Sequence, residues 1–333
     1  MIATAIADAL EEVGTDPRTM MIYAVGQSDA GKQVILQTVT ERALSKLRAE
    51  RKPDDPDVLT ARHNIAYALL NQGKAAEAEA AFRDLLPLRE RVQGPEHPGT
   101  LATRHELARA LLNQGKATEA EAAIRGILSL RERVWGPEHP DTLDTRHGHA
   151  CALLNQGKAA EAEAALRDLL PLRERVQGPE HPGTLVTRHE LARALLAQGN
   201  STEAEAAFRD LLPLRERVQG PEHLGTLATR RQLARATLEQ GAAEQAREQL
   251  SALPDSGDQR PEAKARDAML RGWLADLDGE RPAADTLLDQ AGALLSHLDP
   301  AHHMRRDLAR YRETRGPDGK GGTMVAAEYT KPS

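Results

Sequence analysis

The stretch GPEHPGTL, residues 94–101, returns along the chain at a fixed distance. Its later copies are GPEHPDTL at Gly136, GPEHPGTL at Gly178 and GPEHLGTL at Gly220, so each copy starts 42 residues after the one before it. A fixed period of this length is the signature of a tandem array, in which each repeat packs on its neighbours. The 333-residue length alone would suggest two globular domains of about 150 residues, and the repeat overrides that expectation.

Each 42-residue unit has the pattern of two helices joined by a glycine turn. Apolar side chains recur at helical spacing over Thr100–Gln114, and Gly115 follows as a residue that adopts the left-handed conformation at little cost. A second helix is predicted over Ala117–Val134, and the Gly-Pro pair at Gly136 ends it. Proline lies inside three of the second helices, where we expect it to bend the helix: Pro87, Pro171 and Pro213.

Acidic and basic side chains are paired along the second helices. In each copy a glutamate stands four residues before an arginine: Glu79/Arg83, Glu121/Arg125, Glu163/Arg167 and Glu205/Arg209. Such pairs stabilise a helix by about 0.2–0.5 kcal/mol each. We expect these charges to lie mostly on a solvated face.

Four features follow one another in every full unit. A small residue such as Ala66 in the first helix precedes the glycine turn, then come Glu77-Ala78 and a bulky residue, Phe82. This order resembles the tetratricopeptide repeat, in the 42-residue form found in kinesin light chains and their bacterial relatives. The resemblance implies an all-α fold, a right-handed superhelical solenoid of helix-turn-helix repeats. HEAT and armadillo repeats have a comparable period, but they do not predict the glycine turn followed by Glu-Ala.

The chain departs from the family pattern in its first helices. Arginine stands where the family has a large aromatic residue: Arg62, Arg104, Arg146, Arg188 and Arg230. The asparagine that kinesin light chains carry before Leu-Ala is kept only at Asn64. The resemblance therefore carries the fold and not a shared cargo specificity.

The repeat frame divides the chain into four segments. We expect N-terminal helices and a degenerate repeat over residues 1–51, and the array of 42-residue repeats over 52–253. A degenerate repeat and a capping helix are expected over 254–315, because such stacks need a polar outer end, and a flexible tail over 316–333.

Composition excludes several classes of function. The 44 basic and 50 acidic residues give a net charge of −6 with no basic block, and aromatic residues are only 2%, which argues against nucleic-acid binding. A single cysteine, Cys151, cannot form a disulfide framework within one chain. The first residues lack the pattern of a signal peptide, and no run of 18 apolar residues occurs, so we predict a cytoplasmic protein without membrane contact.

Two patterns suggest chemistry that the repeat explains better. Gly26–Lys32 has the glycine and lysine spacing of a phosphate-binding loop, but Gln33 stands where such loops need Ser or Thr, and the frame makes this segment a repeat turn. The histidines of the loops and first helices recur with the period, so neighbours lie on the order of 10 Å apart, too far to share one metal ion. We predict structural hydrogen bonds for them, no metal or cofactor, and no enzymatic activity.

The resemblance implies that the first helices line the inner, concave side of the solenoid and contact a ligand from alternating positions. Carried onto this chain, the peptide-binding groove comprises His63, Asn64, Tyr67, Asn71, His105, Arg109, Asn113, His147, Cys151, Asn155, His189, Arg193, Arg231 and Arg235. Asparagine can bond a peptide backbone and arginine its carboxylates, so the groove would suit an acidic peptide. Alternatively, these side chains only solvate the groove and bridge adjacent repeats.

Two functions follow from this resemblance. The first is a non-catalytic scaffold or adaptor that binds a protein partner's peptide segment in the groove. The second is a ligand-sensing or regulatory repeat module, related to those attached to signalling ATPases. One copy, residues 115–156, differs from the copy before it at eleven of 42 positions, including Trp135, Asp141 and Cys151, and its role is open.

Overall fold

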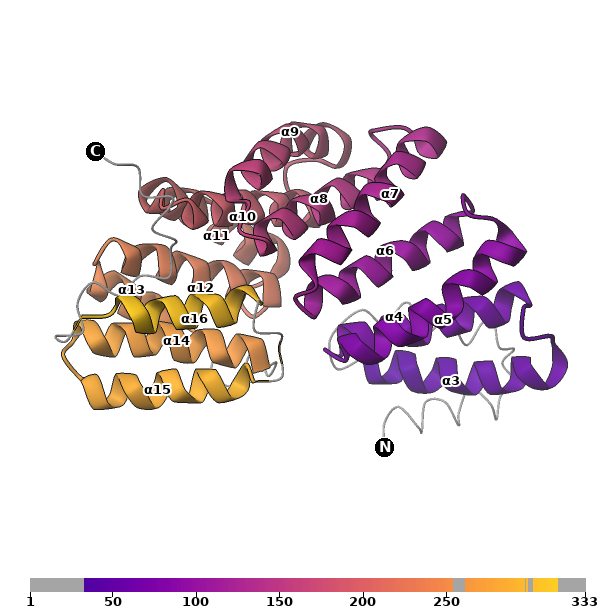
Figure 1. Ribbon diagram of the computed structural model, residues 1–333. Helices are drawn as coiled ribbons and strands as arrows, with labels where there is room; N and C mark the ends of the chain where they lie inside the picture. Colours follow the sequence, from indigo (N-terminus) through magenta and orange to yellow (C-terminus); the bar gives the residue numbers. More distant parts are fainter. Residues whose placement is uncertain (1–32, 254–260, 297, 299–301, 317–333) are drawn as a thin grey trace. The chain divides into compact units, whose positions relative to one another are not determined.

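The computed structural model describes residues 33–253, 261–296, 298 and 302–316, where every regular element is an α-helix (Figure 1). In chain order the helices are α3 (Gln33–Glu50), α4 (Pro56–Asn71), α5 (Ala75–Gln93), α6 (Pro98–Asn113), α7 (Ala117–Trp135), α8 (Pro140–Asn155), α9 (Ala159–Gln177), α10 (Pro182–Ala197), α11 (Ser201–Gln219), α12 (Leu224–Glu239), α13 (Ala243–Ser251), α14 (Pro261–Leu277), α15 (Arg281–Leu294) and α16 (His303–Thr314). The predicted all-α, helix-turn-helix fold is confirmed. The predicted turn at Gly26–Lys32, the residues before it and the tail from 317 lie outside the described residues.

The chain divides into two compact units, Met1–Gly136 and Pro137–Ser333. Unit 1 contains α3 to α7 and unit 2 contains α8 to α16 among the described residues. Within each unit, helices pack on their neighbours in sequence, as a repeat array requires. The division falls inside the predicted array and inside its divergent copy.

The histidine of each copy of the repeated string caps the N-terminus of the helix that follows it. The ring Nδ1 of His97 accepts a hydrogen bond from the backbone N–H of Gly99 at 3.1 Å, and Pro98 occupies the first helical turn. His139, His181 and His223 cap their helices in the same way. Asp55 does so in the repeat before them. The predicted structural role of these histidines is confirmed, and α6 begins at Pro98, directly after its capping residue His97.

Glycines end the helices where the sequence places turns. Gly115 has φ +82° after α6, and Gly136 has φ +87° after α7. A side chain at such a φ is strained, so glycine fixes both the tight turn within a repeat and the exit from it. The second helices α5, α9 and α11 continue through the prolines at their centres.

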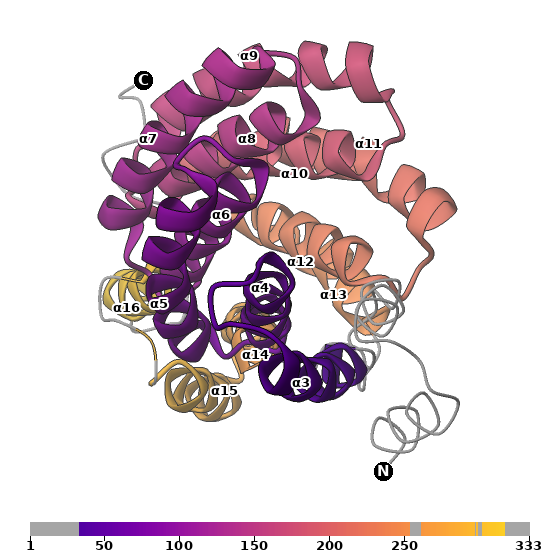
Figure 2. The ribbon, with the colours of Figure 1, turned by 90° about the vertical axis from the view of Figure 1, so that its right-hand side faces the viewer.

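Two layers of helices build each unit. First helices touch one another along the array, α4 with α6 in unit 1 and α8, α10, α12 and α14 in unit 2, and second helices lie outside them (Figure 2). The small residues of the pattern pack between the two layers of helices, and Ala66, Ala150 and Ala192 are fully buried. Phe82 and Phe208 fill the space opposite them and are also fully buried. Small and bulky positions therefore pair as the repeat pattern predicts.

The acidic half of the predicted surface pairs is not on the surface. Glu79, Glu163 and Glu205 are each only 8% exposed, so the expectation of a solvated face is wrong for them. The turn of the following repeat covers each carboxylate: Nε2 of Gln114 donates to Glu79 Oε2 at 2.6 Å, and Lys116 Nζ lies 2.8 Å from the same oxygen. Gln198 and Gln240 bind Glu163 and Glu205 in the same way. These glutamates join consecutive repeats.

A buried arginine makes a second junction. Nη2 of Arg89 donates to the carbonyl oxygen of Leu59 at 3.2 Å, and Arg173 and Arg215 repeat this bond to Leu143 and Leu185. The other terminal nitrogen lies against a glycine of the next first helix, so close that a Cβ atom at Gly99 would come within 2.1 Å of Arg89 Nη1. We call these contacts the Arg–Gly joints: Arg89 with Gly99, Arg173 with Gly183 and Arg215 with Gly225.

In the part of the chain that the structure describes, no helix is both long and apolar enough to cross a bilayer.

Candidate functional site

The inner face, defined here as the groove residues predicted on the first helices, is described for each unit separately. In unit 1 its centre is Arg109 on α6. The guanidinium of Arg109 lies over the ring of Tyr67, 5.8 Å from its centroid, and Nη1 donates to Glu106 Oε2 at 2.6 Å. Nη2 reaches Asn71 Oδ1 at 3.4 Å, and the side chain remains 39% exposed. The structure thus brings Tyr67, Asn71 and Arg109 together as one accessible polar group.

Two of the predicted histidines bridge adjacent repeats. His63 Nδ1 lies 3.2 Å from Thr103 Oγ1 and its ring lies 5.5 Å from that of Phe82. In unit 2, His189 Nδ1 lies 3.1 Å from Thr229 Oγ1 and its ring 5.3 Å from that of Phe208. Burial lowers the pKa of both histidines to about 3, with nearby arginines adding to the effect. Both rings are therefore neutral at physiological pH and hold the first helices side by side.

His147 and Cys151 form a local pair on α8. His147 Nε2 lies 3.4 Å from Cys151 Sγ, one helical turn away. Burial raises the pKa of the thiol far above its usual value, and Glu190 acts in the same direction. Burial also lowers the pKa of His147. The pair is thus a neutral thiol beside a neutral imidazole, without the ion pair that activates a nucleophilic cysteine.

The arginines of unit 2 differ in what they contact. Arg231 is buried and grips Asp267 of α14 with two bonds, Nε to Oδ1 at 2.6 Å and Nη2 to Oδ2 at 3.0 Å. Arg193 donates to Glu190 on its own helix at 2.6 Å. Arg235 reaches forward to Asp307 of α16, Nη1 to Oδ2 at 3.1 Å. Arg231 therefore joins α12 to α14 and Arg235 joins α12 to α16, whereas the 2.6 Å ion pair of Arg193 stays within α10.

The remaining predicted residues lie on the inner face at varied depth. Asn113 is exposed, while Asn64 and His105 are half-buried in unit 1. The carbonyl oxygen of Asn155 in unit 2 accepts a bond from Arg306 Nη2 of α16 at 2.6 Å.

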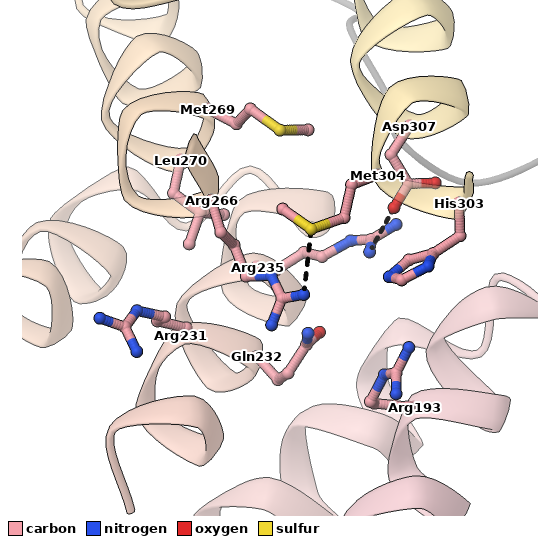
Figure 3. Close-up of a pocket in the computed structure, with 10 residues that line it drawn as sticks. All are labelled: Arg193, Arg231, Gln232, Arg235, Arg266, Met269, Leu270, His303, Met304 and Asp307. Carbon is pink, nitrogen blue, oxygen red and sulfur yellow. Dashed lines mark hydrogen bonds and ion pairs between the residues drawn. The ribbon is translucent and has the colours of Figure 1, made fainter. Parts of the chain in front are cut away.

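Helix α16 lies across the inner face of unit 2. Besides Asp307 and Arg306, it contributes Met304, whose sulfur lies 3.6 Å from Arg266 Nη2 on α14. Figure 3 shows Arg266, Met304 and Asp307 converging with His303 between α12, α14 and α16. A helix predicted only as an end cap is therefore also a contact of the candidate binding surface.

Two adjoining hollows flank this contact, of about 380 Å³ and about 690 Å³ including the space that opens to solvent. Both are lined by Arg193, Gln232, Arg235, His303 and Asp307. Arg231 and Arg266 line the first, and Arg306 and Arg310 line the second. Six arginines thus face these hollows together with one carboxylate.

Sequence reasoning missed part of this site. Gln232, Arg266, His303 and Asp307 were not among the predicted groove residues. Arg266 and Asp307 lie outside the strict 42-residue register, so the repeat could not mark them. The sequence signal for this helix was the charged segment MRRDLARYR, which begins at Met304 and contains Asp307.

No group of three His, Cys, Asp or Glu side chains suited to a metal ion occurs within residues 33–253, 261–296, 298 and 302–316.

The sequence comparison with known families agrees with this geometry. The profile of the tetratricopeptide repeat matches residues 57–123, 105–175, 152–217 and 190–252, which together span more than half of the chain. The chain belongs to the tetratricopeptide repeat family. The matching family is a repeat and not a catalytic domain. No curated protein matches this tetratricopeptide repeat chain significantly.

The chain is similar to several solved structures. A putative kinesin light chain of Podosopora anserina with nearly identical TPR-like repeats is 28% identical, with 62% of this chain and 92% of that chain covered and a TM-score of 0.48. NprR in complex with its cognate peptide NprX is 14% identical over 88% of this chain and 80% of that chain, with a TM-score of 0.68. The apo form of RapI is 10% identical over 84% and 98%, with a TM-score of 0.63.

Proposed function

We propose that this tetratricopeptide repeat protein is a non-catalytic scaffold or adaptor that holds an acidic peptide segment of a protein partner on its inner face. The observation that carries the proposal is the group of arginine side chains on that face. Accessible Arg109 lies among Tyr67 and Asn71 in unit 1, and Arg193 and Arg235 line the hollows in unit 2. Guanidinium groups bind carboxylates through two parallel hydrogen bonds, and asparagine bonds peptide groups.

One comparison supports this function: NprR, which shares the fold, was solved in complex with its cognate peptide NprX. We expect the partner segment to be extended, because Arg193 and Arg235 lie one repeat apart on consecutive first helices of unit 2 and an extended chain can meet them in succession.

The test compares two triple variants of the full chain. R109Q/R193Q/R235Q removes three inner-face charges, and R125Q/R175Q/R217Q removes three charges from second helices whose side chains are 61–72% exposed. Each is used for affinity capture from native lysate, and captured partners are then titrated as purified proteins. Circular dichroism checks that both variants stay helical.

The proposal expects a partner that binds wild type and the outer variant alike and loses at least tenfold in affinity for the inner variant. Equal binding to both variants would place the interaction elsewhere and contradict the proposal. If wild type captures no partner, the proposal fails, and thermal-shift screening of small ligands then tests the ligand-sensing module that the sequence also suggests.

A further inference from the structure

The two hollows in unit 2 are lined by more arginines than carboxylates. Arg231 is neutralised by Asp267 and Arg193 by Glu190. Arg266 is different: its bond to the thioether of Met304 is its one hydrogen bond within the described part of the chain, and a thioether is a weak acceptor. A half-buried guanidinium without a carboxylate partner is costly, since desolvation is not offset by an ion pair.

The neighbours of Arg266 reinforce this imbalance. Burial, reinforced by the charges of Arg193, Arg231 and Arg235 and opposed by Asp307, lowers the pKa of Arg266 to about 10. A group surrounded by like charges gains more than an isolated one from a bound anion. Asp307 is the one carboxylate that lines the hollow, and Arg235 already engages it at 3.1 Å.

His303 is a second, independent sign of a missing ligand. Neither ring nitrogen has a hydrogen-bond partner among the described residues, and neither is exposed to solvent. Burial holds the pKa of His303 well below its usual value, so the ring is neutral and still offers one N–H donor. Its ring lies beside the arginines that line both hollows (Figure 3).

We propose that this hollow, lined by Arg193, Arg235, Arg266 and His303, binds a carboxylate of the peptide ligand, and that Asp307 of α16 occupies the place of that carboxylate in the ligand-free chain. The site rests on the proposed peptide-binding function and names the chemistry recognised in unit 2. Asp307 is a competitor in cis: it presents to Arg235 the group that a ligand presents, from a helix that already lies across the inner face.

The experiment titrates the full chain with three N-acetylated octapeptides by calorimetry. The first alternates alanine with glutamate and has an amidated end, the second alternates alanine with glutamine and ends in a free carboxylate, and the third is the glutamine peptide with an amidated end. The first two separate a side-chain carboxylate from a terminal one, and the third carries none.

Removing the competitor is the decisive change. D307N is expected to bind at least one of the carboxylate peptides about five to ten times more tightly than wild type, because apparent affinity rises when the competent state is more populated. D168N, which removes an exposed carboxylate on α9, is expected to match wild type. In the D307N background, R266Q is expected to lose about tenfold in affinity and R266K to lose less, since lysine keeps the charge but not the planar pair of donors.

Three outcomes would overturn this site: D307N binding no more tightly than wild type, the amidated glutamine peptide binding as well as the others, or no peptide binding to either protein. If these occur while a native partner still depends on the inner-face arginines, the proposed function stands and the carboxylate site falls. If D307N gains affinity as expected but no native partner is captured, the site stands and the adaptor function falls.

Discussion

The four copies of the repeated string each connect the second helix of one repeat to the first helix of the next, and one of these four junctions differs from the other three. Between α5 and α6, α9 and α10, and α11 and α12, a buried arginine lies against a glycine at the start of the next helix. At the junction of α7 with α8, Asp141 replaces that glycine and Trp135 replaces the glutamine that ends the other second helices. The arginine of this copy, Arg131, lies 5.6 Å from the centroid of the Trp135 ring.

The difference coincides with the boundary between the two compact units, which falls between Gly136 and Pro137. An aspartate has a Cβ atom where Gly99, Gly183 and Gly225 leave room for an arginine nitrogen. The capping histidine and the proline after it are unchanged at this junction. The boundary between the units therefore coincides with the junction whose residues depart from the other three.

The largest effect is expected from closing the glycine space of a regular joint. In G183A the new Cβ would lie 2.1 Å from Nη1 of Arg173, a buried side chain that also bonds Leu143 and Asp144. Moving that guanidinium costs about 2–3 kcal/mol of unfolding free energy, measured by urea denaturation. G126A is the matched control, because Gly126 lies inside α7 with open space around it, and it is expected to gain about 0.5–1 kcal/mol. Equal effects of the two changes would show that the joint does not depend on this close approach.

The second effect tests the buried glutamates. Burial opposes ionisation of Glu79, but hydrogen bonds from Lys116, Gln114 and Arg83 outweigh it and hold its pKa below the usual value. E79Q is expected to lower the unfolding free energy by about 1–3 kcal/mol at pH 7, because Lys116 and Arg83 lose the carboxylate that they both bond. The control is E77Q, because Glu77 is exposed. Its unfolding free energy is expected to change by only about 0.2–0.5 kcal/mol, as is usual for a surface charge.

The same pair of variants gives a pH dependence with a defined sign. A carboxyl whose pKa is lower in the folded state stabilises the protein fully above its unfolded pKa, 4.5, and loses this contribution as pH falls through the folded value. The difference between wild type and E79Q is therefore expected to be constant above pH 5.5 or so and to shrink below about pH 4.5. A difference that grows on acidification would contradict the assignment.

A smaller effect is expected at the helix caps. H181A removes the ring nitrogen that accepts the Gly183 N–H and is expected to cost about 1 kcal/mol, read from the thermal midpoint. H181D is the rescue variant, because Asp55 caps α4 by the same bond. If H181D is as unstable as H181A, the histidine acts through packing and not as a cap.

W135Q/D141G is expected to shift the urea midpoint of unfolding least, but to change the slope of unfolding free energy against urea concentration. This variant gives the divergent junction the residues of the three regular ones. The dependence of unfolding free energy on urea is expected to steepen by about a quarter, because more surface then unfolds in one step. An unchanged slope would mean that other positions of the divergent copy set the boundary between the units.

The repeat made much of the fold predictable from sequence. Period 42 places the turn at Gly115, the small residue at Ala66 and the helix start after His97, because each depends on residues nearby or one repeat away. The burial of Glu79 was missed, since its i,i+4 arginine gave a local reason to place it on the surface, whereas Gln114 of the next turn covers it.

The candidate site was predictable only in part, for a similar reason. Arg109, Arg193 and Arg235 lie on the inner face at repeat spacing. Their partners do not all follow that spacing, since Arg235 meets Asp307, 72 residues later, in a helix outside the array. No period relates α16 to the helices that it contacts, so only the three-dimensional structure shows that it lies across the candidate binding surface.

Helix α16 also sets the order in which the protein can acquire its structure. Most contacts of a repeat array join residues fewer than about 45 positions apart, and such local topologies fold rapidly. The bond from Arg306 to Asn155 instead closes a loop of 151 residues. Because closing this loop costs conformational entropy until the intervening repeats have formed, we expect α16 to dock last in the folding of unit 2. Unit 2 is therefore expected to refold with an additional slow phase.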